Sequence, residues 1–455
     1  MKRIPVTQIV LGLLCLTYFI TYLDRVNVST AADGFSKDFG LNKTQIGLVF
    51  SAFGYPYLMF QIIGGWLSDR LGARRTLIAC GTIWAAATVL TGMATGLLTL
   101  LLARLLLGFG EGATFPAATT AMSRWFPPEK RGYVQGIAHA AARIGNAVAP
   151  GAIVMVMAAA GWRASFYACA FASFAWVLLW ALTFTEWPKD HPRITPQELT
   201  PLPVQEHQKP NTPWGPLFKR MAPVTIVYLC YGWNLWLFLS WIPQYFLHSY
   251  HLDLKQSAMF SAGVFFAGVL GDTLGGWVTD KILQRTGSLT KARSWMVSIC
   301  LLLAALTLIP LAFTHSLGVS LACLSAGFFF AEMTIGPMWA IPMDIAPAWS
   351  GTASGMMNTG SATAIIISPV VSGYLIDRFQ NWELPFVFDA LLMILGVVLS
   401  SRMRPDDIFE PASASHAAPH GVGQHPDAVD LNLHGRTILH RPHPQRRPDG
   451  DHVAG

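Results

Sequence analysis

Residues 65–70 read GWLSDR, and residues 276–281 read GWVTDK, each at the end of an apolar segment. Further matches between the two parts of the chain keep a nearly constant spacing, at offsets of 211 to 221 residues. They pair Glu111 with Glu332, Pro116 with Pro337, Pro127 with Pro347, Pro150 with Pro369, Trp162 with Trp382, and Phe166 with Phe386. Because the matches stay in order over a long stretch, they predict a duplicated structural unit.

The composition nearly excludes a soluble protein. Of the 455 residues, 53% are apolar or aromatic and only 12% carry charge, whereas soluble domains average about 25% charged residues. The mean hydropathy is +0.42. The six cysteines all lie in apolar runs without the spacing of a disulfide framework or a zinc site, so we expect them to pack as small apolar side chains.

Twelve apolar runs are long enough to cross a membrane, since a helix needs about 20 residues to span the hydrocarbon core. They lie at 7–31, 46–67, 76–95, 98–123, 134–160, 163–185, 222–248, 257–280, 294–313, 317–343, 352–376 and 384–402. Each repeat holds six runs, an even number, so both copies enter the membrane from the same side. The predicted fold is therefore an all-α membrane protein with twelve transmembrane helices in two parallel six-helix repeats. Such repeats place a substrate site at mid-depth between them and rock around it in alternating access.

The Lys and Arg residues of the loops orient the spans, because short cytoplasmic loops carry an excess of positive charge. With the N-terminus inside, 19 basic residues face the cytoplasm and five face outward. Both termini are therefore predicted to be cytoplasmic, in a multi-pass protein of the cell (inner) membrane. The first run contains Asp24 and Arg25, and no small-residue cleavage site follows it, so we expect a retained span rather than a signal peptide.

Two polar stretches divide the chain. We predict an N-terminal six-helix bundle at 1–185, a cytoplasmic linker rich in Pro and charge at 186–221, a C-terminal six-helix bundle at 222–404, and a disordered cytoplasmic tail at 405–455. The tail holds seven of the 13 histidines. Their spacing is irregular, so no metal site is predicted there.

Charged residues inside the spans mark the candidate site, because a charge at mid-membrane is costly and usually faces the bundle interior or a wet cavity. The first half places Asp24, Arg25, Arg104, Glu111 and Arg143 inside its spans. Arg104 and Glu111 are seven residues apart, which is two helical turns and about 10 Å of rise along one face, so both can line one cavity. A guanidinium binds a carboxylate through two hydrogen bonds and stays charged. Arg25 is therefore the first candidate to anchor an anionic substrate.

Two carboxyl groups, Asp24 and Glu111, are the candidate proton carriers. Desolvation favours the neutral form of a buried carboxyl, whereas a neighbouring arginine favours the charged form. We expect both groups to bind protons on the outward side and to release them inside. The alternative is that Asp24–Arg25 and Arg104–Glu111 are buried ion pairs that only fix the register of the helices.

Further polar residues lie in later spans. His139 and Arg143 are four residues apart on one helical face. If Arg143 faces the cavity, a second positive anchor favours a dicarboxylate or a larger sugar acid; the alternative is an inward-lying pair with span four or eight. In the second half, Asp272 is a further candidate for titration, whereas Glu332 and Asp344 are expected to cap or pair near the inner ends of spans ten and eleven.

Two motifs resemble those of the major facilitator superfamily, and the resemblance covers residues 1–404. The loop reads Gly65-x-Leu67-Ser68-Asp69-Arg70-x-Gly72-x-Arg74-Arg75, is repeated in part around Asp280, and is similar to the loop that gates the cytoplasmic side in that family. A second motif, Arg104-x-x-x-Gly108-x-Gly110, resembles a signature of proton-coupled members. The resemblance implies gating by Gly65, Asp69, Arg70, Gly72, Arg74 and Asp280.

Other motifs resemble the anion:cation symporter branch, which includes permeases for hexuronates, galactonate, glucarate and phthalate-like acids. The matching segments are Tyr22-x-Asp24-Arg25-x-Asn27, Tyr57-x-x-x-Gln61, Gly110-Glu111-Gly112 with Phe115-Pro116, Trp241-Ile242-Pro243-x-Tyr245, Trp339 and Gly355-x-x-Asn358. The resemblance implies proton coupling by Asp24 and Glu111. It implies substrate binding by Tyr22, Arg25, Tyr57, Gln61, Arg104, Trp339 and Asn358.

The sequence thus predicts proton-coupled uptake of a small organic carboxylate, with a sugar acid as the first candidate. An organic-anion exchanger or exporter is the alternative, and a non-transporting membrane sensor is a more distant one. No catalytic or phosphate-binding motif occurs, so we predict no enzymatic activity. We expect no cofactor beyond the coupling proton, with sodium as the alternative ion. We expect a monomer in the bilayer and no nucleic-acid partner, because the net charge of +6 comes from loops that follow the topology.

Overall fold

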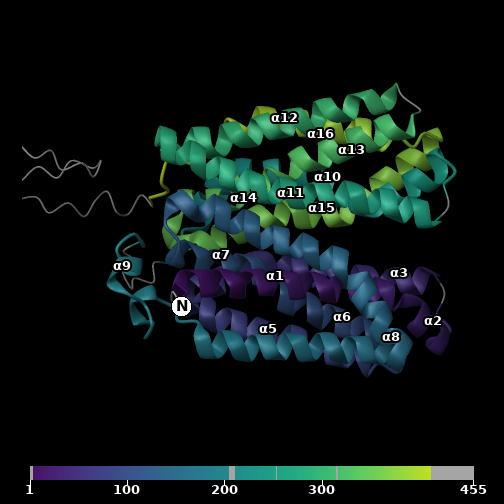
Figure 1. Ribbon diagram of the computed structural model, residues 1–455, viewed down its shortest axis with the longest axis horizontal. Coiled ribbons are helices and arrows are strands. Elements are labelled where there is room, and N and C mark those ends of the chain that lie inside the picture. The colour runs from purple at the N-terminus through teal and green to yellow at the C-terminus, as the bar shows by residue number, and fades with distance from the viewer. Residues whose placement is uncertain (1–3, 42, 204–210, 253, 314–315, 411–455) are drawn as a thin grey trace, which may run out of the picture. The chain divides into compact units, whose positions relative to one another are not determined.

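The described part of the chain is helical and contains no strand (Figure 1). In the computed structural model, the described residues are 4–41, 43–203, 211–252, 254–313 and 316–410. They belong to one compact unit, Met1–Pro411. The predicted tail lies outside the described residues from position 411 onward, as do residues 204–210 of the predicted linker.

The first half contains eight α-helices. They are α1 (Val6–Thr30), α2 (Ala32–Phe39), α3 (Lys43–Ala52), α4 (Gly54–Leu71), α5 (Ala73–Gly92), α6 (Leu97–Gly112), α7 (Thr114–Trp125) and α8 (Arg131–Thr183), with a short 3₁₀ turn at Pro128–Lys130. Two predicted spans are interrupted, at Phe53 and at Ala113. Each interruption stands three residues before a proline, Pro56 or Pro116, whose ring prevents a regular helical hydrogen bond. Gly161 has a φ of 81° and kinks α8 where the fifth and sixth predicted spans meet.

The second half follows the linker, which contains a 3₁₀ turn at Pro188–Asp190 and the short helix α9 (Pro196–Leu199). Its elements are α10 (Trp214–Ser249), α11 (Leu254–Thr286), the π-helix η3 (Thr290–Trp295), α12 (Met296–Leu308), η4 (Ile309–Ala312), α13 (Leu317–Glu332), α14 (Ile335–Ile345), η5 (Pro347–Trp349), α15 (Ser350–Phe379) and α16 (Leu384–Ser400). Helix α10 begins eight residues before the predicted start of its span at 222, because Leu217 and Met221 are already buried against the bundle. The interruption between α13 and α14 precedes Pro337, which is the repeat counterpart of Pro116.

Nine helical segments in the described ranges are long and apolar enough to cross a membrane, and α16 is a shorter apolar helix. Many of the exposed side chains are large and apolar, among them Phe171, Leu182 and Phe313. Apolar surface of this extent is typical of a protein that contacts lipid. The count of twelve spans and the side of the membrane on which the termini lie stay predictions.

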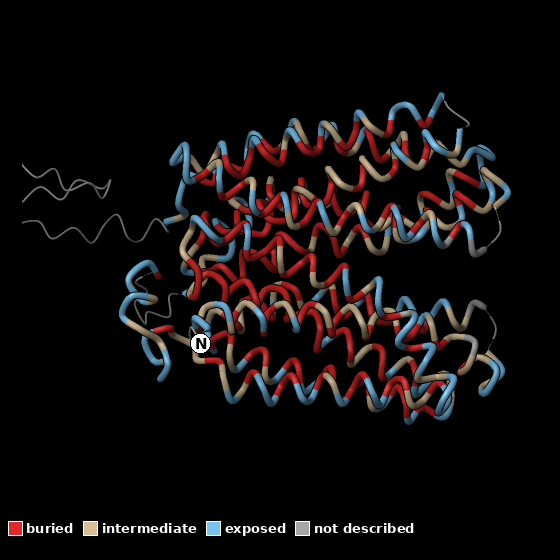
Figure 2. The backbone as a smooth tube through the Cα atoms, in the orientation of Figure 1, coloured by how far each residue is buried: buried red, intermediate tan, exposed pale blue. Residues whose placement is uncertain are grey.

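The helices of the two halves form two groups that lie side by side, purple to blue for the first half and teal to yellow for the second (Figure 1). The groups meet chiefly where α4 packs on α15 and where α8 packs on α11. Figure 2 shows buried residues where the groups meet and exposed residues along the outer helices. Polar side chains at this contact can therefore bond to residues of both halves.

Glycines allow the halves to touch at two equivalent places. A Cβ added to Gly65 of α4 would meet the carbonyl of Gly351 on α15, and a Cβ added to Gly276 of α11 would meet the carbonyl of Gly132 on α8. Gly65 and Gly276 occupy the same position in the two copies of the repeat. The duplicated loop thus supplies the same close approach twice.

Replacing Gly65 by alanine is expected to separate α4 from α15 and to lower the stability of this packed arrangement. Overpacking of this kind typically costs about 1–3 kcal/mol. The matched control is Gly12→Ala on α1, because a Cβ there meets no atom within 4 Å. Thermal unfolding of the purified variants should show a lower Tm for Gly65→Ala than for Gly12→Ala; equal Tm values would contradict the close-packing argument.

Candidate functional site

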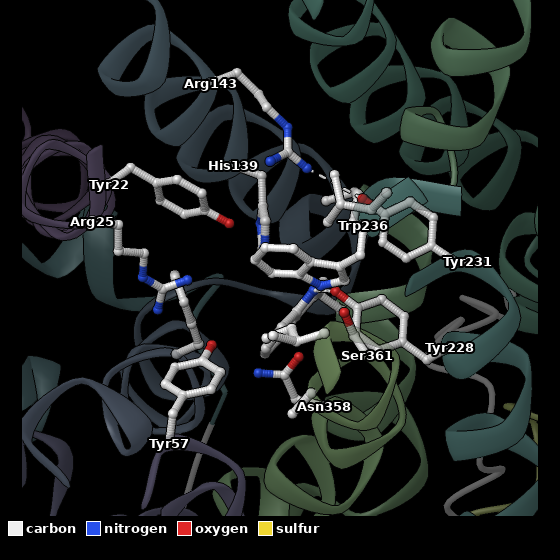
Figure 3. Close-up of a pocket in the computed structure, with 16 residues that line it drawn as sticks. Tyr22, Arg25, Tyr57, His139, Arg143, Tyr228, Tyr231, Trp236, Asn358 and Ser361 are labelled. Carbon is white, nitrogen blue, oxygen red and sulfur yellow. Dashed lines mark hydrogen bonds between the residues drawn. The ribbon is translucent and has the colours of Figure 1, made fainter. Parts of the chain in front are cut away.

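A small cavity of about 30 Å³ lies between the two halves (Figure 3). The first half lines it with Tyr22, Arg25, Tyr57, Phe115, His139 and Arg143. The second half lines it with Tyr228, Tyr231, Leu235, Trp236, Ile335, Trp339, Asn358, Ser361, Ala362 and Ile365. Two guanidinium groups and a set of aromatic rings therefore face one space between the halves.

Arg25 is held on the first-half side of the cavity by a carboxylate and by aromatic rings. Its Nε donates a hydrogen bond of 2.7 Å to Oε2 of Glu111, which is fully buried near the end of α6. The guanidinium carbon lies 4.7 Å from the centroid of the Tyr57 ring and 5.0 Å from that of Tyr22. Cation–π contacts of this kind stabilise a desolvated guanidinium. The arrangement keeps a positive charge at the cavity wall, where an anion can reach it.

Arg143 crosses the cavity wall and joins the two halves. Its Nη2 donates to Oε2 of Glu332 on α13, at 2.8 Å, and to the hydroxyl of Tyr231 on α10, at 3.2 Å. The Tyr231 hydroxyl in turn donates to Oε1 of Glu332, at 3.0 Å. A second carboxylate, Oδ2 of Asp272 on α11, lies 3.6 Å from Nε of Arg143. Arg143 lines the cavity and also forms inward pairs. Its nearest partner, Glu332, lies on predicted span ten and not on span four or eight, whereas the more distant Asp272 lies on span eight.

Neutral hydrogen-bonding groups complete the wall. Trp339 donates through Nε1 to the hydroxyl of Tyr228, at 2.7 Å. Asn358 donates through Nδ2 to Oε1 of Gln61, at 2.8 Å. Gln61 is buried behind the lining rather than in it, so in this arrangement it orients the Asn358 amide without facing the cavity.

Arg104 and Asp24 lie outside the lining. Nε of Arg104 donates to the backbone carbonyl of Val49, at 3.3 Å, and its guanidinium lies over the Phe53 ring. Oδ2 of Asp24 accepts a hydrogen bond from Ser173, at 3.2 Å. The expectation that Arg104 lines the cavity is therefore wrong for this arrangement.

The ion-pair partners also differ from expectation. The alternative of separate Asp24–Arg25 and Arg104–Glu111 pairs is not realised, because Glu111 pairs with Arg25 instead. Glu111 itself stands behind the lining and reaches the cavity only through Arg25. The orientation of α6 relative to α1 decides which charged residues pair. The spacing of residues along one helix does not predict this orientation.

Two carboxylates at one end of the bundle connect the halves by capping helices. Asp69 of α4 accepts hydrogen bonds from the backbone N–H groups of Gly351 and Thr352 at the start of α15, at 2.8 and 2.7 Å, and from the Thr352 hydroxyl at 2.6 Å. Its repeat counterpart Asp280 accepts from the backbone N–H groups of Gly132 and Tyr133 at the start of α8, at 3.1 and 2.7 Å. A carboxylate at a helix N-terminus is stabilised by the unpaired N–H groups and the helix dipole.

Additional polar contacts close the same end. Arg131 of α8 pairs with Asp344 of α14 at 2.9 Å, and Ser123 of α7 shares a hydrogen bond with Ser350 of α15. Across the described ranges, the hydrogen bonds and ion pairs between the halves lie at the cavity or on the side of it that carries Asp69 and Asp280. Polar contacts therefore hold the two halves together on that side of the cavity.

The remaining residues of the predicted gate contact their own half or the linker. Arg70 lies over the Trp66 ring and donates to Asn211, whereas the backbone N–H of Arg74 donates to Glu186 beyond the end of α8. Gly72 has a φ of 92°, and a Cβ there would meet the Glu186 carboxylate. Of the six predicted gating residues, Gly65, Asp69 and Asp280 touch the opposite half.

Sequence reasoning missed part of the second-half lining. Tyr228, Tyr231 and Leu235 follow each other at helical spacing on one face of α10, a pattern that could have identified them as one surface. Glu332 does not cap an inner helix end as expected, because it ends α13 beside the cavity and pairs with Arg143. Asp344 forms ion pairs with Arg131 and Arg293 on the side of the cavity that carries Asp69 and Asp280; that this side is the inner one stays a prediction.

Comparison with known proteins supports a membrane transporter. The sequence profile of the Major Facilitator Superfamily matches residues 14–369. The chain is 44% identical over 409 residues to the "probable sulfoacetate transporter SauU" of Cupriavidus necator, covering 89% of this chain and 95% of that protein. It is 29% identical to the hexuronate transporter of Bacillus subtilis, covering 88% and 95%.

Solved structures show the same fold at low sequence identity. The fucose transporter FucP in its outward conformation aligns with a TM-score of 0.69 at 15% identity, over 87% of this chain and 99% of that chain. The human organic anion transporter MFSD10 aligns with a TM-score of 0.64 at 15% identity, over 87% and 98%.

The relatives are transporters rather than enzymes, so the absence of enzymatic activity that the sequence predicts agrees with the family. The two bacterial relatives are named for organic anions, sulfoacetate and hexuronate, in agreement with the resemblance drawn from the motifs. The chain belongs to the Major Facilitator Superfamily of membrane transporters.

Proposed function

We propose that the protein imports a small organic dianion together with protons, by alternating access of the cavity to the two sides of the membrane. The observation that carries this proposal is the pair of guanidinium groups, Arg25 and Arg143, that face one buried cavity between the halves. Guanidinium groups bind carboxylate and sulfonate-type oxygens through two parallel hydrogen bonds. An anion held by both arginines would contact both halves of the protein.

The spacing of the two arginines favours a compact dianion. Their guanidinium carbons lie 5.0 Å (Arg25) and 5.9 Å (Arg143) from the centroid of the same Tyr22 ring, so they are no farther apart than the sum of these distances. A guanidinium carbon sits about 4 Å from the central atom of an acidic group that it binds, so two acidic groups on the line between the arginines would lie at most roughly 3 Å apart. Acidic groups joined through a single carbon fit this separation, and sulfoacetate, named for a 44% identical relative, is such an acid.

The charges around the cavity favour coupling to protons. Arg25 and Arg143 face three carboxyl groups, Glu111, Glu332 and Asp272. If all three carboxyl groups were ionised, a bound dianion would raise the local excess of negative charge further in a desolvated site, which is strongly unfavourable. Proton uptake by these carboxyl groups would offset the added charge.

The contacts around Asp69 and Asp280 close one end of the bundle, and the charge distribution favours the cytoplasmic side for this end. The positive-inside distribution of Lys and Arg places Asp69 and Asp280 at the cytoplasmic end. The contacts of these residues then close the path to the cytoplasm, and the protein would accept its substrate from outside. With this orientation we propose twelve spans in a cell membrane, cytoplasmic termini and a monomeric transporter. Attaching a fluorescent protein that folds only in the cytoplasm to the C-terminus tests the orientation, and a dark fusion would contradict it.

Uptake into liposomes that contain the purified protein tests the proposal. With an acidic outside and no sodium, labelled sulfoacetate should accumulate, and a protonophore should abolish the accumulation. Accumulation only with a sodium gradient would replace protons by sodium, and accumulation only into preloaded vesicles would show an exchanger.

Competition by unlabelled acids tests the substrate class in the same vesicles. Malonate, whose two acidic groups are joined by one carbon, should compete with sulfoacetate. Acetate and methanesulfonate carry a single charge and should compete at least about 10-fold less well, because one guanidinium contact is lost. Glucuronate is added as a competitor to test the sugar acid that the sequence predicts as substrate. Equal competition by the single-charge acids would contradict the use of both arginines.

A further inference from the structure

The carboxyl group of Glu332 is the repeat counterpart of Glu111. Glu111 lies at the end of α6, one residue before its C-terminus, and Glu332 is the last residue of α13. Both helices stop where a proline follows a few residues later, at Pro116 and Pro337. The duplication therefore places a buried glutamate at the same helix interruption in each half, and each glutamate holds an arginine of the cavity wall, Arg25 or Arg143.

The second-half glutamate differs from the first in having another carboxyl group beside it. Asp272 is completely buried, and neither of its carboxylate oxygens accepts a hydrogen bond from a donor in the described part of the chain. Its carboxyl group and that of Glu332 both pair with the single guanidinium of Arg143, at 3.6 and 2.8 Å. Two ionised carboxylates on one guanidinium at a buried site repel each other strongly, and the guanidinium compensates only one of them.

We propose that Asp272 and Glu332 share one proton and form a second proton-coupling site, in the C-terminal half, that Arg143 connects to the substrate cavity. The shared proton neutralises the charge that Arg143 leaves uncompensated. It also gives the Asp272 oxygens the hydrogen-bond partner that they otherwise lack. The inference rests on the proposed function for its transport role, but the sharing of a proton is a property of the protein without substrate.

Other titratable groups that face this site come from three helices. They are Arg143 and His139 on α8, Tyr228 and Tyr231 on α10, and Tyr22 on α1. Arg143 is the one permanent positive charge among them. Whether the carboxyl pair of Asp272 and Glu332 holds a proton therefore depends on what Arg143 contacts.

Substrate and proton are linked through this guanidinium. When an anion in the cavity takes hydrogen bonds from Arg143, Glu332 and Asp272 lose their counter-charge and retain the proton more firmly. When the cavity opens to the cytoplasm and the anion leaves, Arg143 returns to Glu332, and water that enters from the cytoplasmic side takes the proton from the carboxyl pair; the pair takes up a proton again when the cavity opens to the outside. Only O–H bonds form and break, and the proton taken from the outer solution is the one released inside. Linkage requires that the proton also strengthens binding of the anion.

The first test uses the protein without substrate. Asp272→Asn removes one carboxyl group and leaves the Arg143–Glu332 ion pair intact, so the variant should fold. Infrared spectra of wild type should contain the C=O stretch of a protonated carboxyl group that disappears in Asp272→Asn. An unchanged intensity in this region would overturn the shared proton, whether or not sulfoacetate is a substrate.

The second test measures how many protons accompany each sulfoacetate, from the membrane potential that stops net flux in liposomes. Asp272→Asn should lower the ratio by one proton per sulfoacetate. The matched control is Asp389→Asn, because Asp389 is equally buried but accepts a hydrogen bond from Asn234 and forms no ion pair with an arginine of the described ranges. The control should keep the wild-type ratio. An unchanged ratio in Asp272→Asn, or the same fall in both variants, would overturn the coupling role.

Discussion

Replacement of Arg25 by lysine is expected to reduce uptake of sulfoacetate about 10- to 100-fold, because the substrate loses one charged hydrogen bond worth about 1.5–3 kcal/mol. Lysine keeps the positive charge but has no planar fork, so it cannot bind Glu111 and an anionic group of the substrate in the same way. It also loses the stacking of the guanidinium on the Tyr22 and Tyr57 rings. The change therefore tests geometry rather than charge.

The matched control for this substitution is Arg163→Lys. Arg163 pairs with Asp38, but both side chains are about 40% exposed and lie away from the cavity. An exposed ion pair contributes little, so uptake should stay close to the wild-type rate. Initial rates over a range of sulfoacetate concentrations, with the amount of reconstituted protein measured, give the comparison. Uptake by Arg25→Lys at a rate similar to Arg163→Lys would show that Arg25 does not hold the substrate.

Replacement of Asp69 by asparagine is expected to loosen the closed end and shift the protein toward an arrangement that is open at this end. The Asp69 carboxylate accepts two backbone hydrogen bonds at the start of α15 and one from the Thr352 hydroxyl. Asparagine removes the negative charge that the helix N-terminus favours and offers one oxygen instead of two. A loss of about 1.5–3 kcal/mol shifts the balance between the two arrangements by roughly 10- to 100-fold.

Spin labels at two exposed positions on the closed end, Arg75→Cys and Arg402→Cys, report this shift as a distance distribution. Wild type should show mainly the short distance, and Asp69→Asn should add a longer one. Asp377→Asn is the control, because Asp377 is exposed at the other end of α15. A distribution in Asp69→Asn that matches the control would mean that the cap does not hold the halves together.

Asp280→Asn, the same substitution at the repeat counterpart of Asp69, should also shift the protein toward the arrangement that is open at this end. Asp280 caps α8 as Asp69 caps α15, but Asp280 also pairs with Arg293. Arg293 has a second carboxylate partner in Asp344. Its charge would therefore stay compensated after Asp280→Asn, so the variant isolates the loss of the helix cap.

The internal repeat made the equivalent contacts of the two loops predictable from sequence. The offset between residues 65–70 and 276–281 identified two equivalent loops, and the structure places Gly65 with Gly276 and Asp69 with Asp280 in equivalent contacts. Such contacts are predictable because a glycine and a carboxylate four residues apart on one helix have few structural uses at that spacing. The cavity residues Tyr22, Arg25, Tyr57, Trp339 and Asn358 also lie together, at the positions that the motifs indicated.

The partners of the buried charges were not predictable in the same way. Residue spacing fixes which side chains share a face of one helix, but the rotation of one helix against another decides that Glu111 meets Arg25 rather than Arg104. Arg143 shows the same difficulty across the two halves, because its partners Glu332 and Asp272 are 189 and 129 positions away along the chain. The start of α10 at Trp214 was missed because burial of Leu217 and Met221 extends a helix into a segment whose composition resembled a linker.

A structure of the protein with sulfoacetate bound tests most directly whether the two arginines hold one anion between the halves. We expect density in the cavity with one acidic group on the Arg25 guanidinium and the other on Arg143. Sulfoacetate bound to only one arginine, or bound outside the space lined by Tyr22, Trp339 and Asn358, would contradict the account.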